Sequence, residues 1–578
     1  MRVLIFHGYL LGGTGSNVYN ARLAEALVGL GHDVHLLCQD RHPERQSFVD
    51  ATGDWDEGEL RVRSLRPELY GQSGHCTIYR PDIGDLLPVY VADRYEGITA
   101  RAFAQCTELE VAYYIDANVA AIREVVELVR PQGALANHLV MGPVILARGL
   151  AGNGVPYAVK VHGSALEYTV KPEPERFLGF AREGLESAAG ILAGSSHTAH
   201  SLWSAVEREY VVERTRLGPP GVDVHRFTPN IDSDGDGLLR TDRQALRAVA
   251  GRLHHTASAS DVRSPIDGAF TSDDLAAAEA LERVSSPAAN GVEAAAHGPL
   301  VMFIGKLIVS KGIDLLIAAW PLVLEKMPRA TLLVVGFGAY RDTVERLMAS
   351  LAAGDLPAAL EIARIGRAAE DPDAIGAPPL RHLQAFLNGL HGEQRAHYLA
   401  AAAALPERLV LTGRLDHEEL IDLLPACEAL VVPSTFPESF GMVAAEGAAC
   451  GALPVSAAHS GLAEVSAVLA QAVPSQAARW LSFPVDDDAV SALAERIVGW
   501  LGAEPELRQQ AREGLVAAVG ENWSWEGVAR GVLAAAHGDL ESLARPTPHT
   551  LFIPVDHRES IVPRRSSGHG TNLDKRVP

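Results

Sequence analysis

Two glutamates, Glu438 and Glu446, stand eight residues apart in PESFGMVAAEGAACG, a stretch that is otherwise mostly small, apolar and helix-prone. On one helix, eight steps of about 100° would leave them roughly 80° apart and separated by a rise of about 12 Å. That rise is too large for a carboxylate pair acting on one bond, which needs at most about 10 Å, and suits the two ends of one elongated ligand. Because burying an unpaired carboxylate is costly, Glu446 should meet a polar partner such as ligand hydroxyls. The alternative is an exposed glutamate on a helix surface.

A second group of residues that could do chemistry lies in IGKLIVSKGIDLL, residues 304–316. Gly305 follows a predicted strand there, and Lys306 and Lys311 stand five residues apart. If Lys311 opens the next helix, both ammonium groups can reach one anion above the carboxyl end of the strand. The alternative is that both are solvated surface lysines, the usual situation for this residue.

The loop LLGGTGSN, residues 10–17, lies between the first predicted strand and the first predicted helix. Its glycines, Gly12 and Gly13 among them, permit positive φ, and its amides lie at a helix N-terminus, a natural anion site. A dinucleotide fingerprint would also start here, with Asp40 as its ribose-binding acid. However, Val18 stands where the third glycine belongs, and no GK[ST] follows for a Walker loop. A tight turn that requires glycine is the alternative.

His162 comes directly after a predicted strand in VKVHGSALEY, where it either faces a ligand or has a structural role. Two other stretches only partly resemble metal sites. DSDGDG, residues 232–237, starts like a calcium loop, but Arg243 occupies the position where a bidentate glutamate belongs. His254 and His255 have no partner at ligand spacing. We therefore expect no metal and no cofactor.

The bulk composition narrows the class of protein. The chain has 578 residues, 47% hydrophobic and 21% charged, which fits an ordinary globular protein of two to four domains. The sequence contains no run of about 18 apolar residues, so we expect no transmembrane helix. The start of the chain is typical of a strand rather than a secretory signal. A formal net charge of −22 opposes non-specific binding to nucleic acid or anionic lipid. The five cysteines lack CxxC spacing, which favours a reducing, cytoplasmic location over a disulfide framework.

Short β-like runs alternate with amphipathic helices in both halves of the chain, which predicts parallel sheets wrapped by helices. The expected strands are 2–6, 33–38, 134–137, 157–161 and 190–194 in the first half, and 300–305, 330–336, 408–413, 429–434 and 452–456 in the second. The predicted fold class is α/β, with two facing Rossmann-like domains. A ligand should bind in the cleft between them, at the carboxyl ends of the strands.

We expect the N-terminal domain to span 1–229 and the C-terminal domain to span 299–540. Between them, 230–298 is acidic and rich in Ser, Asp, Gly and Ala, with at most two short helical patterns, and predicts a flexible or loosely folded insertion. An alanine-rich helical insertion is expected at about 353–406. The tail, 541–578, is expected to be disordered.

In order along the chain, these motifs resemble those of the retaining glycosyltransferases of family 4, which have the two-domain GT-B architecture. The strongest is an E-x7-E signature, Glu438 to Glu446, followed by HSGLAEV, residues 459–465, which is similar to the family's GG-x-PE loop. LLGGTGSN, GPPGVDVHRFTP, FIGKLIVSKGIDLL and LLVVGFGAYRDTVERL also match in order. The resemblance covers about 1–229 and 299–540.

The resemblance implies metal-independent transfer of a sugar from a nucleoside diphosphate to an acceptor, with retention of anomeric configuration. Glu438 would bind hydroxyls of the donor sugar, Glu446 would bind the ribose hydroxyls, and His162 would lie beside the transferred sugar. The lysines would neutralise the departing diphosphate. The implied catalytic residues are thus Lys306, Lys311, Glu438 and His162, and the implied substrate-binding residues are Gly12, Gly13, Gly305, Arg414, Phe440, Gly441, Met442, Val443 and Glu446.

Two positions depart from the family pattern. Lys306 stands where many members have arginine, so the bidentate fork is lost, and Ala463 stands where the loop usually has proline. A UDP-sugar is the first expected donor and GDP-mannose the second, whereas the acceptor (a glycan, a lipid-linked sugar or a small molecule) is open. The aromatic, loop-like segment 75–97 is a candidate acceptor rim. The rival readings are a non-catalytic nucleotide- or glycan-binding protein and an NAD(P)-dependent oxidoreductase.

Overall fold

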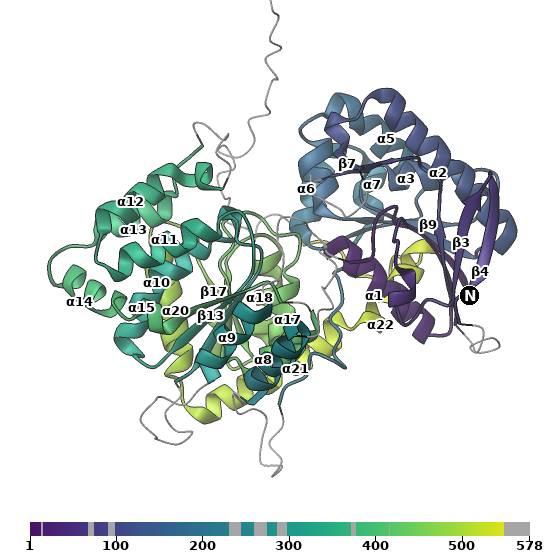
Figure 1. Cartoon of the computed structure of the whole chain (residues 1–578). Helices are drawn as coiled ribbons and strands as arrows, with labels where there is room; N and C mark the ends of the chain where they lie inside the picture. The colour runs from purple at the N-terminus through teal and green to yellow at the C-terminus, as the bar shows by residue number, and fades with distance from the viewer. Residues whose placement is uncertain are drawn as a thin grey trace, which may run out of the picture.

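The computed structural model describes residues 1–12, 15–66, 74–90, 99–230, 244–258, 274–285, 298–370, 377–415 and 417–547. These residues form two lobes, each built on a mainly parallel sheet that is covered by helices (Figure 1). The predicted fold class, α/β with two Rossmann-like domains, is confirmed.

The N-terminal sheet contains nine strands of the described chain, in the order β11-β10-β9-β8-β1-β2-β5-β3-β4. Its neighbouring strands are parallel except for the hairpin β3–β4. Strands β8, β9 and β10 are buried along their whole length, as expected for parallel strands with both faces covered. The strands are β1 Arg2–Phe6, β2 Asp33–Leu37, β3 Ala51–Asp56, β4 Glu59–Ser64, β5 Cys76–Arg80, β8 Gly133–Asn137, β9 Tyr157–Val161, β10 Gly190–Ala193 and β11 Thr215–Leu217, with β6 Leu86–Val89 and β7 Thr99–Ala102 paired separately.

The described residues of the C-terminal lobe form a six-stranded parallel sheet in the order β14-β13-β12-β15-β16-β17. Its strands are β12 Leu300–Ile304, β13 Thr331–Val335, β14 Leu409–Gly413, β15 Ala429–Val432, β16 Leu453–Ala457 and β17 Ser482–Phe483. Because β12 and β15 are neighbours, the loops that follow them leave the sheet side by side, at the edge where such sheets bind ligands. All ten strands expected from the sequence are present.

Helices follow most of these strands. In the N-terminal lobe they are α1 Gly15–Gly29, α2 Glu108–Val129, α3 Gly142–Gly149, α4 Gly163–Ala165, α5 Pro174–Glu186, α6 Ser196–Val206 and α7 Glu209–Arg214. In the C-terminal lobe they are α10 Ile313–Lys326, α11 Arg341–Ala352, α16 His417–Leu423, α17 Met442–Ala449, α18 Ser460–Ala472, α19 Ser475–Ala478, α20 Ala489–Leu501 and α21 Pro505–Trp523.

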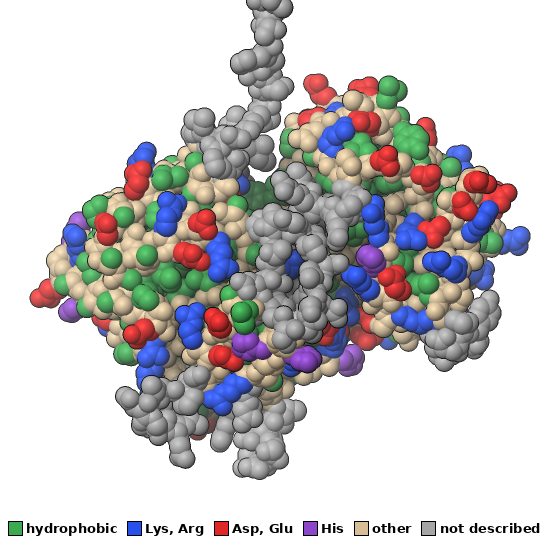
Figure 2. Space-filling view, viewed as in Figure 1, with side chains coloured by type: hydrophobic (Ala, Val, Ile, Leu, Met, Phe, Trp, Pro, Cys, Tyr) green, Lys and Arg blue, Asp and Glu red, His purple; other side chains and the backbone are tan. Residues whose placement is uncertain are grey.

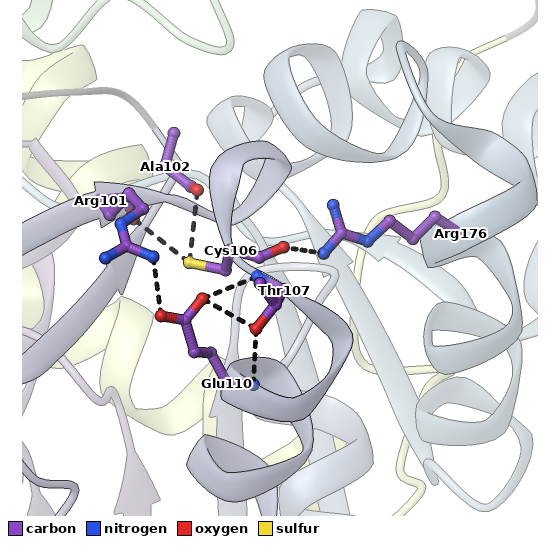
Figure 3. A network of polar contacts seen from close by, with 6 residues as sticks. All are labelled: Arg101, Ala102, Cys106, Thr107, Glu110 and Arg176. Atoms are coloured by element: carbon purple, nitrogen blue, oxygen red, sulfur yellow. Dashed lines mark hydrogen bonds and ion pairs between the residues drawn. The ribbon is translucent and has the colours of Figure 1, made fainter.

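The start of α2 shows how local sequence fixes a helix end (Figure 3). The Thr107 hydroxyl accepts from the Glu110 N–H, and the Glu110 carboxylate accepts from the Thr107 N–H, which is a capping box. The same carboxylate pairs with Arg101 at 2.7 Å. Arg176, from α5, donates to the carbonyl of Cys106, so this end of α2 is also tied to a neighbouring helix.

The final helix, α22 Trp525–Ala536, returns to the N-terminal lobe, where Figure 1 shows it beside α1. The chain remains on this lobe afterwards, since the Thr547 N–H donates to Ser196 Oγ at 3.0 Å. The C-terminal lobe therefore ends before residue 540, the expected bound, and the first part of the predicted disordered tail is packed on the fold. Residues 548–578 lie outside the described part of the chain.

Both predicted insertions contain helices. In the first, α8 Gln244–Ser258 and α9 Asp274–Ser285 pack against each other and against the C-terminal lobe, with Leu246, Leu253 and Leu281 fully buried in its core. The prediction of a loosely folded segment is wrong for these two helices, because their apolar faces supply part of that core. The second insertion is helical as predicted, with α12 Leu356–Ile365, α13 Arg381–Gly389, α14 Gly392–Ala402 and α15 Leu405–Arg408.

The segment expected to form an acceptor rim, 75–97, includes β5, which lies inside the N-terminal sheet between β2 and β3. Cys76 and Ile78 are fully buried there, and Tyr79 is 2% exposed. The description of this segment as a loop-like rim is therefore wrong for β5, because its aromatic and apolar residues face the core. Residues 91–98 lie outside the described chain.

Charged side chains of both signs are interspersed over both lobes on the face that Figure 2 draws. Among the helices that the structure describes, none is long and apolar enough to cross a membrane.

Candidate functional site

The loops after β12 and β15 meet at the carboxyl end of the C-terminal sheet, and their charged side chains touch there. The Lys311 ammonium donates to Glu438 Oε1, and the Ser434 hydroxyl donates to the same oxygen at 2.7 Å. Burial alone would raise the pKa of the Glu438 carboxyl, but the ammonium holds it below its ordinary value, so this side chain is an anion at neutral pH. The structure thus brings together two of the residues expected to be catalytic.

The loop after β12 carries the other predicted residues of this group. Gly305 is half-buried and Lys306 is exposed. Lys311 ends a short 3₁₀ turn, and α10 begins only after Gly312, whose φ is +66°. Lys311 therefore lies in the turn before the helix and does not open it. Gly312 is needed at this point because a Cβ on it would lie 1.9 Å from a backbone oxygen of the neighbouring loop.

The helix α17 begins at Met442, and Gly441 precedes it with a φ of +137°. Glu438 therefore lies in the loop before the helix, and the 12 Å rise expected for a single helix does not apply. The amides of Phe440, Gly441, Met442 and Val443 lie at or just before the first turn of α17. Amides at this position lack helical partners and favour an anion.

Glu446 is buried in the middle of α17, with 6% of its surface exposed, and it has a histidine partner. His417 Nε2 lies 3.2 Å from Glu446 Oε1, and this hydrogen bond raises the pKa of His417 above its ordinary value. Glu446 is thus not an exposed helix-surface glutamate. Both residues line a cavity between the lobes, together with Val18, Arg22, Gly221, Asp223, Arg226, Phe227, Ile421, Met442 and Trp525.

His162 follows β9 and lies opposite the loop that carries Glu438. The next residue, Gly163, packs so closely on Ser439 that a Cβ on it would lie 2.2 Å from the serine Oγ. His162 Nε2 lies 3.0 Å from Asn137 Oδ1. Burial lowers the pKa of the His162 ring well below its ordinary value, so the imidazole is neutral at pH 7.

The glycine-rich loop after β1 is braced by side chains. Gly12 is exposed, and its carbonyl accepts from Asn17 Nδ2 at 2.6 Å. The Leu11 N–H donates to Asp40 Oδ2 at 2.9 Å, so Asp40, the acid of the dinucleotide fingerprint that the sequence fails to match, braces this loop. Gly13 lies outside the described residues.

Arg414 follows β14 and places its guanidinium over the ring of Phe337, 5.4 Å from the centroid. The carbonyl of Phe337 accepts from the Leu307 N–H at 2.7 Å. Arg414 therefore lies beside the loop that carries the two lysines.

A carboxylate joins the two lobes next to this site. Glu464, on α18, accepts from the N–H groups of Ser196 and His197 at 2.7 and 2.9 Å, at the N-terminus of α6. A negative charge at a helix N-terminus is favourable because it meets unpaired amides and the positive end of the helix dipole. Glu464 belongs to the HSGLAEV segment, which the sequence singled out without predicting this contact. His417 was not predicted either, because 29 positions separate it from Glu446.

Within the described ranges, no group of three or more His, Cys, Asp or Glu side chains could hold a metal ion. His254, considered above as a possible ligand, instead lies 3.1 Å from the Glu282 carboxylate. The calcium-loop-like stretch 232–237 lies outside the described residues.

Two family models match the chain. The model described as a glycosyl transferase 4-like domain matches residues 14–212, and the model described as glycosyl transferases group 1 matches residues 382–513. Together these matches cover more than half of the chain.

Two curated relatives match more weakly. D-inositol 3-phosphate glycosyltransferase of Xylanimonas cellulosilytica is 25% identical over 306 residues, which are 53% of this chain and 49% of the relative. The uncharacterized glycosyltransferase MJ1607 of Methanocaldococcus jannaschii is 23% identical over 246 residues, 43% of this chain and 46% of the relative. The chain thus spans about half the length of the curated relatives it matches.

Solved structures match the chain at low sequence identity and with TM-scores under 0.5. The catalytic domain of starch synthase IV from Arabidopsis thaliana, bound to ADP and acarbose, has a TM-score of 0.49 at 14% identity, covering 93% of this chain and 98% of that one. Anabaena HepE in complex with UDP has a TM-score of 0.47 at 15% identity, covering 94% of this chain and 100% of that one.

Proposed function

The chain belongs to the family 4 type of GT-B glycosyltransferases, and on that basis we propose that it transfers a sugar from a nucleoside diphosphate sugar to an acceptor, with retention of anomeric configuration. The donor would lie along the cleft. Its sugar would contact Glu438, its diphosphate would contact Lys306 and Lys311, and its ribose would contact Glu446.

The observation that carries this proposal is the contact between Lys311 and Glu438 in front of the N-terminus of α17. Cleavage of the bond from the anomeric carbon to the diphosphate leaves negative charge on the phosphate and positive charge on the sugar. An ammonium and unpaired helix amides stabilise the first charge, and a carboxylate beside the sugar tolerates the second. Fixed cations of the chain thus supply the charge that a divalent metal would supply in a metal-dependent transferase.

The N-terminal lobe contributes a neutral group to the same site. His162, held by Asn137, can share a hydrogen bond with a sugar hydroxyl without adding positive charge next to the developing oxocarbenium ion. The close packing of Gly163 on Ser439 keeps this part of the cleft narrow, which limits access of water to the donor.

The donor and the acceptor are proposed as classes of compound, in the order in which they should be tested. A UDP-sugar is the first donor to test, GDP-mannose is the second and ADP-glucose is the third. The Xylanimonas relative is named for D-inositol 3-phosphate, so a small phosphorylated polyol is a reasonable first acceptor for the screen.

A screen of purified protein against these sugar nucleotides, following release of the nucleoside diphosphate, tests the proposal. Glu446→Ala should weaken nucleotide binding about ten- to hundredfold, because a charged acceptor of hydrogen bonds contributes about 1.5–3 kcal/mol. Lys311→Ala should mainly lower kcat, by about a hundredfold or more, because it removes charge stabilisation of the leaving group. Lys326→Ala, which removes an exposed lysine at the end of α10, is the matched control.

The result decides between the readings. If neither site variant differs from the parent in turnover or nucleotide affinity, the assignment of the site is wrong. Binding of UDP or GDP without consumption of any donor would favour the non-catalytic binding protein.

A further inference from the structure

The short turn Val309–Lys311 sets the backbone position of Lys311, and hydrogen bonds attach this turn to the loop after β15. The Thr435 N–H donates to the Ser310 carbonyl at 2.9 Å, and the Thr435 hydroxyl donates to the Val309 carbonyl at 3.4 Å. Gly312 closes the turn against the same loop. These contacts fix the carbonyl side of the turn and leave its first amide to find a partner elsewhere.

That partner comes from the helical insertion. The Val309 N–H donates to Glu370 Oε2 at 2.6 Å, a short distance typical of a charge-assisted hydrogen bond. Val309 is 7% exposed, and an amide at the start of a 3₁₀ turn has no partner within the turn. Sixty-one positions separate the two residues, so the contact depends on the insertion being folded in place.

Glu370 is itself held in position. Its other carboxylate oxygen lies 3.6 Å from the Arg367 guanidinium, and only 13% of the Glu370 side chain is exposed. Both residues lie at the end of a short helical turn that follows α12, and α12 packs on α11 and α13. Within the insertion, the backbone at Gly366 packs so closely on a later segment that a Cβ would lie 2.1 Å from the Pro378 carbonyl oxygen. The carboxylate is therefore presented from a packed support.

We propose that Glu370 is a positioning residue for the donor diphosphate: by fixing the first amide of the turn Val309–Lys311, it sets the direction in which Lys311 points. This inference rests on the proposed function. It also assigns a role to the insertion at about 353–406, which holds an amide of the lysine-bearing loop, whereas Thr435 holds two of its carbonyls. The interaction with diphosphate remains that of Lys306 and Lys311, and Glu370 acts through the backbone.

Three variants separate this role from a general effect on folding. Glu370→Ala removes the acceptor of the Val309 hydrogen bond. Glu370→Gln keeps an oxygen that can accept from the same amide. Glu361→Ala removes an exposed carboxylate of the same insertion, which pairs with Arg364 on its own helix, and is the matched control.

Amide hydrogen exchange of the full chain is the first readout, because it does not depend on any donor. We expect faster exchange in the peptide covering 305–312 for Glu370→Ala, and parental exchange there for Glu370→Gln and Glu361→Ala. The second readout is turnover of the sugar nucleotide that the donor screen selects. We expect kcat of Glu370→Ala to fall about ten- to hundredfold, with restoration to within about threefold of the parent in Glu370→Gln.

Parental exchange at 305–312 and parental kcat in Glu370→Ala would overturn the inference. So would equal losses in Glu370→Ala and Glu361→Ala, or a Gln variant as impaired as the Ala variant. A parent that consumes no donor while Glu370→Ala still loosens 305–312 would instead refute the proposed function and leave the positioning contact in place.

Discussion

Asp314 offers a quantitative test of the packing behind the lysine-bearing loop. It lies in the first turn of α10, is 3% exposed, and has one carboxylate oxygen with no hydrogen-bond partner among the described residues. Burial, opposed only in part by two backbone N–H groups, raises its pKa from 3.8 to about 7. The perturbation is Asp314→Asn, which keeps the shape and removes the ionisation.

The sign follows from proton binding. The folded state keeps the Asp314 proton up to about pH 7, whereas the unfolded chain releases it near 3.8, so the folded state binds more protons between these values. The contribution to the free energy of unfolding is therefore full at low pH and is lost as pH rises through about 7. With these two pKa values, the loss between pH 5 and pH 8 is roughly 2–3 kcal/mol.

Urea unfolding of parent and Asp314→Asn at pH 5, 6.5 and 8 measures this loss. Between pH 5 and pH 8, the free energy of unfolding of the parent should fall by roughly 2–3 kcal/mol relative to that of the variant. Asp342→Asn, which changes an exposed aspartate in the first turn of α11, should follow the parent at every pH. Parallel curves for parent and Asp314→Asn would refute the reasoning.

One further prediction concerns the junction of the lobes, and another concerns a buried lysine of the N-terminal sheet. Glu464→Ala removes two charge-assisted hydrogen bonds to α6, so the two lobes should separate more easily. Small-angle scattering should then give a larger radius of gyration than for Glu495→Ala, a control on the exposed surface. An unchanged radius of gyration would contradict this prediction. Lys160 is buried, and burial lowers its pKa from 10.5 to about 7. Between these two pH values the unfolded chain binds one more proton than the folded chain, so the free energy of unfolding rises with pH from about 7 to 10. Lys160→Met should abolish that rise in thermal unfolding measured at pH 7 and 9.5. A rise that persists in the variant would exclude Lys160 as its source.

The sequence predicted the central strands because they are short apolar runs bounded by glycine or polar residues, and buried parallel strands require that pattern. It missed the hairpin β3–β4, whose second strand is mostly exposed and polar. Glu57 and Gly58 in the turn of that hairpin both adopt positive φ, and of the two only the glycine is a residue type that signals such a turn. The return of α22 to the N-terminal lobe could not be predicted from the sequence of the helix. An amphipathic pattern shows which face is buried and does not show which lobe that face packs against.

For the candidate site, the sequence could not predict which side chains the named residues would contact. The sequence indicated that Glu446 needs a polar partner, but His417 supplies one from another helix, and such a pairing has no local signature. The position of Glu438 before the helix could have been predicted from its neighbours. Pro437 and Gly441 flank Glu438, and Gly441 marks the start of the helix. The anchoring of Val309 by Glu370 arises only once the insertion is folded against the sheet.

The most direct test of the account is a crystal structure of the protein with the selected sugar nucleotide bound. The account predicts diphosphate oxygens within about 3.2 Å of the Lys306 and Lys311 ammonium groups, ribose hydroxyls on Glu446, and sugar hydroxyls on Glu438. A donor bound elsewhere, with Lys311 still paired to Glu438 and Glu446 still paired only to His417, would contradict it.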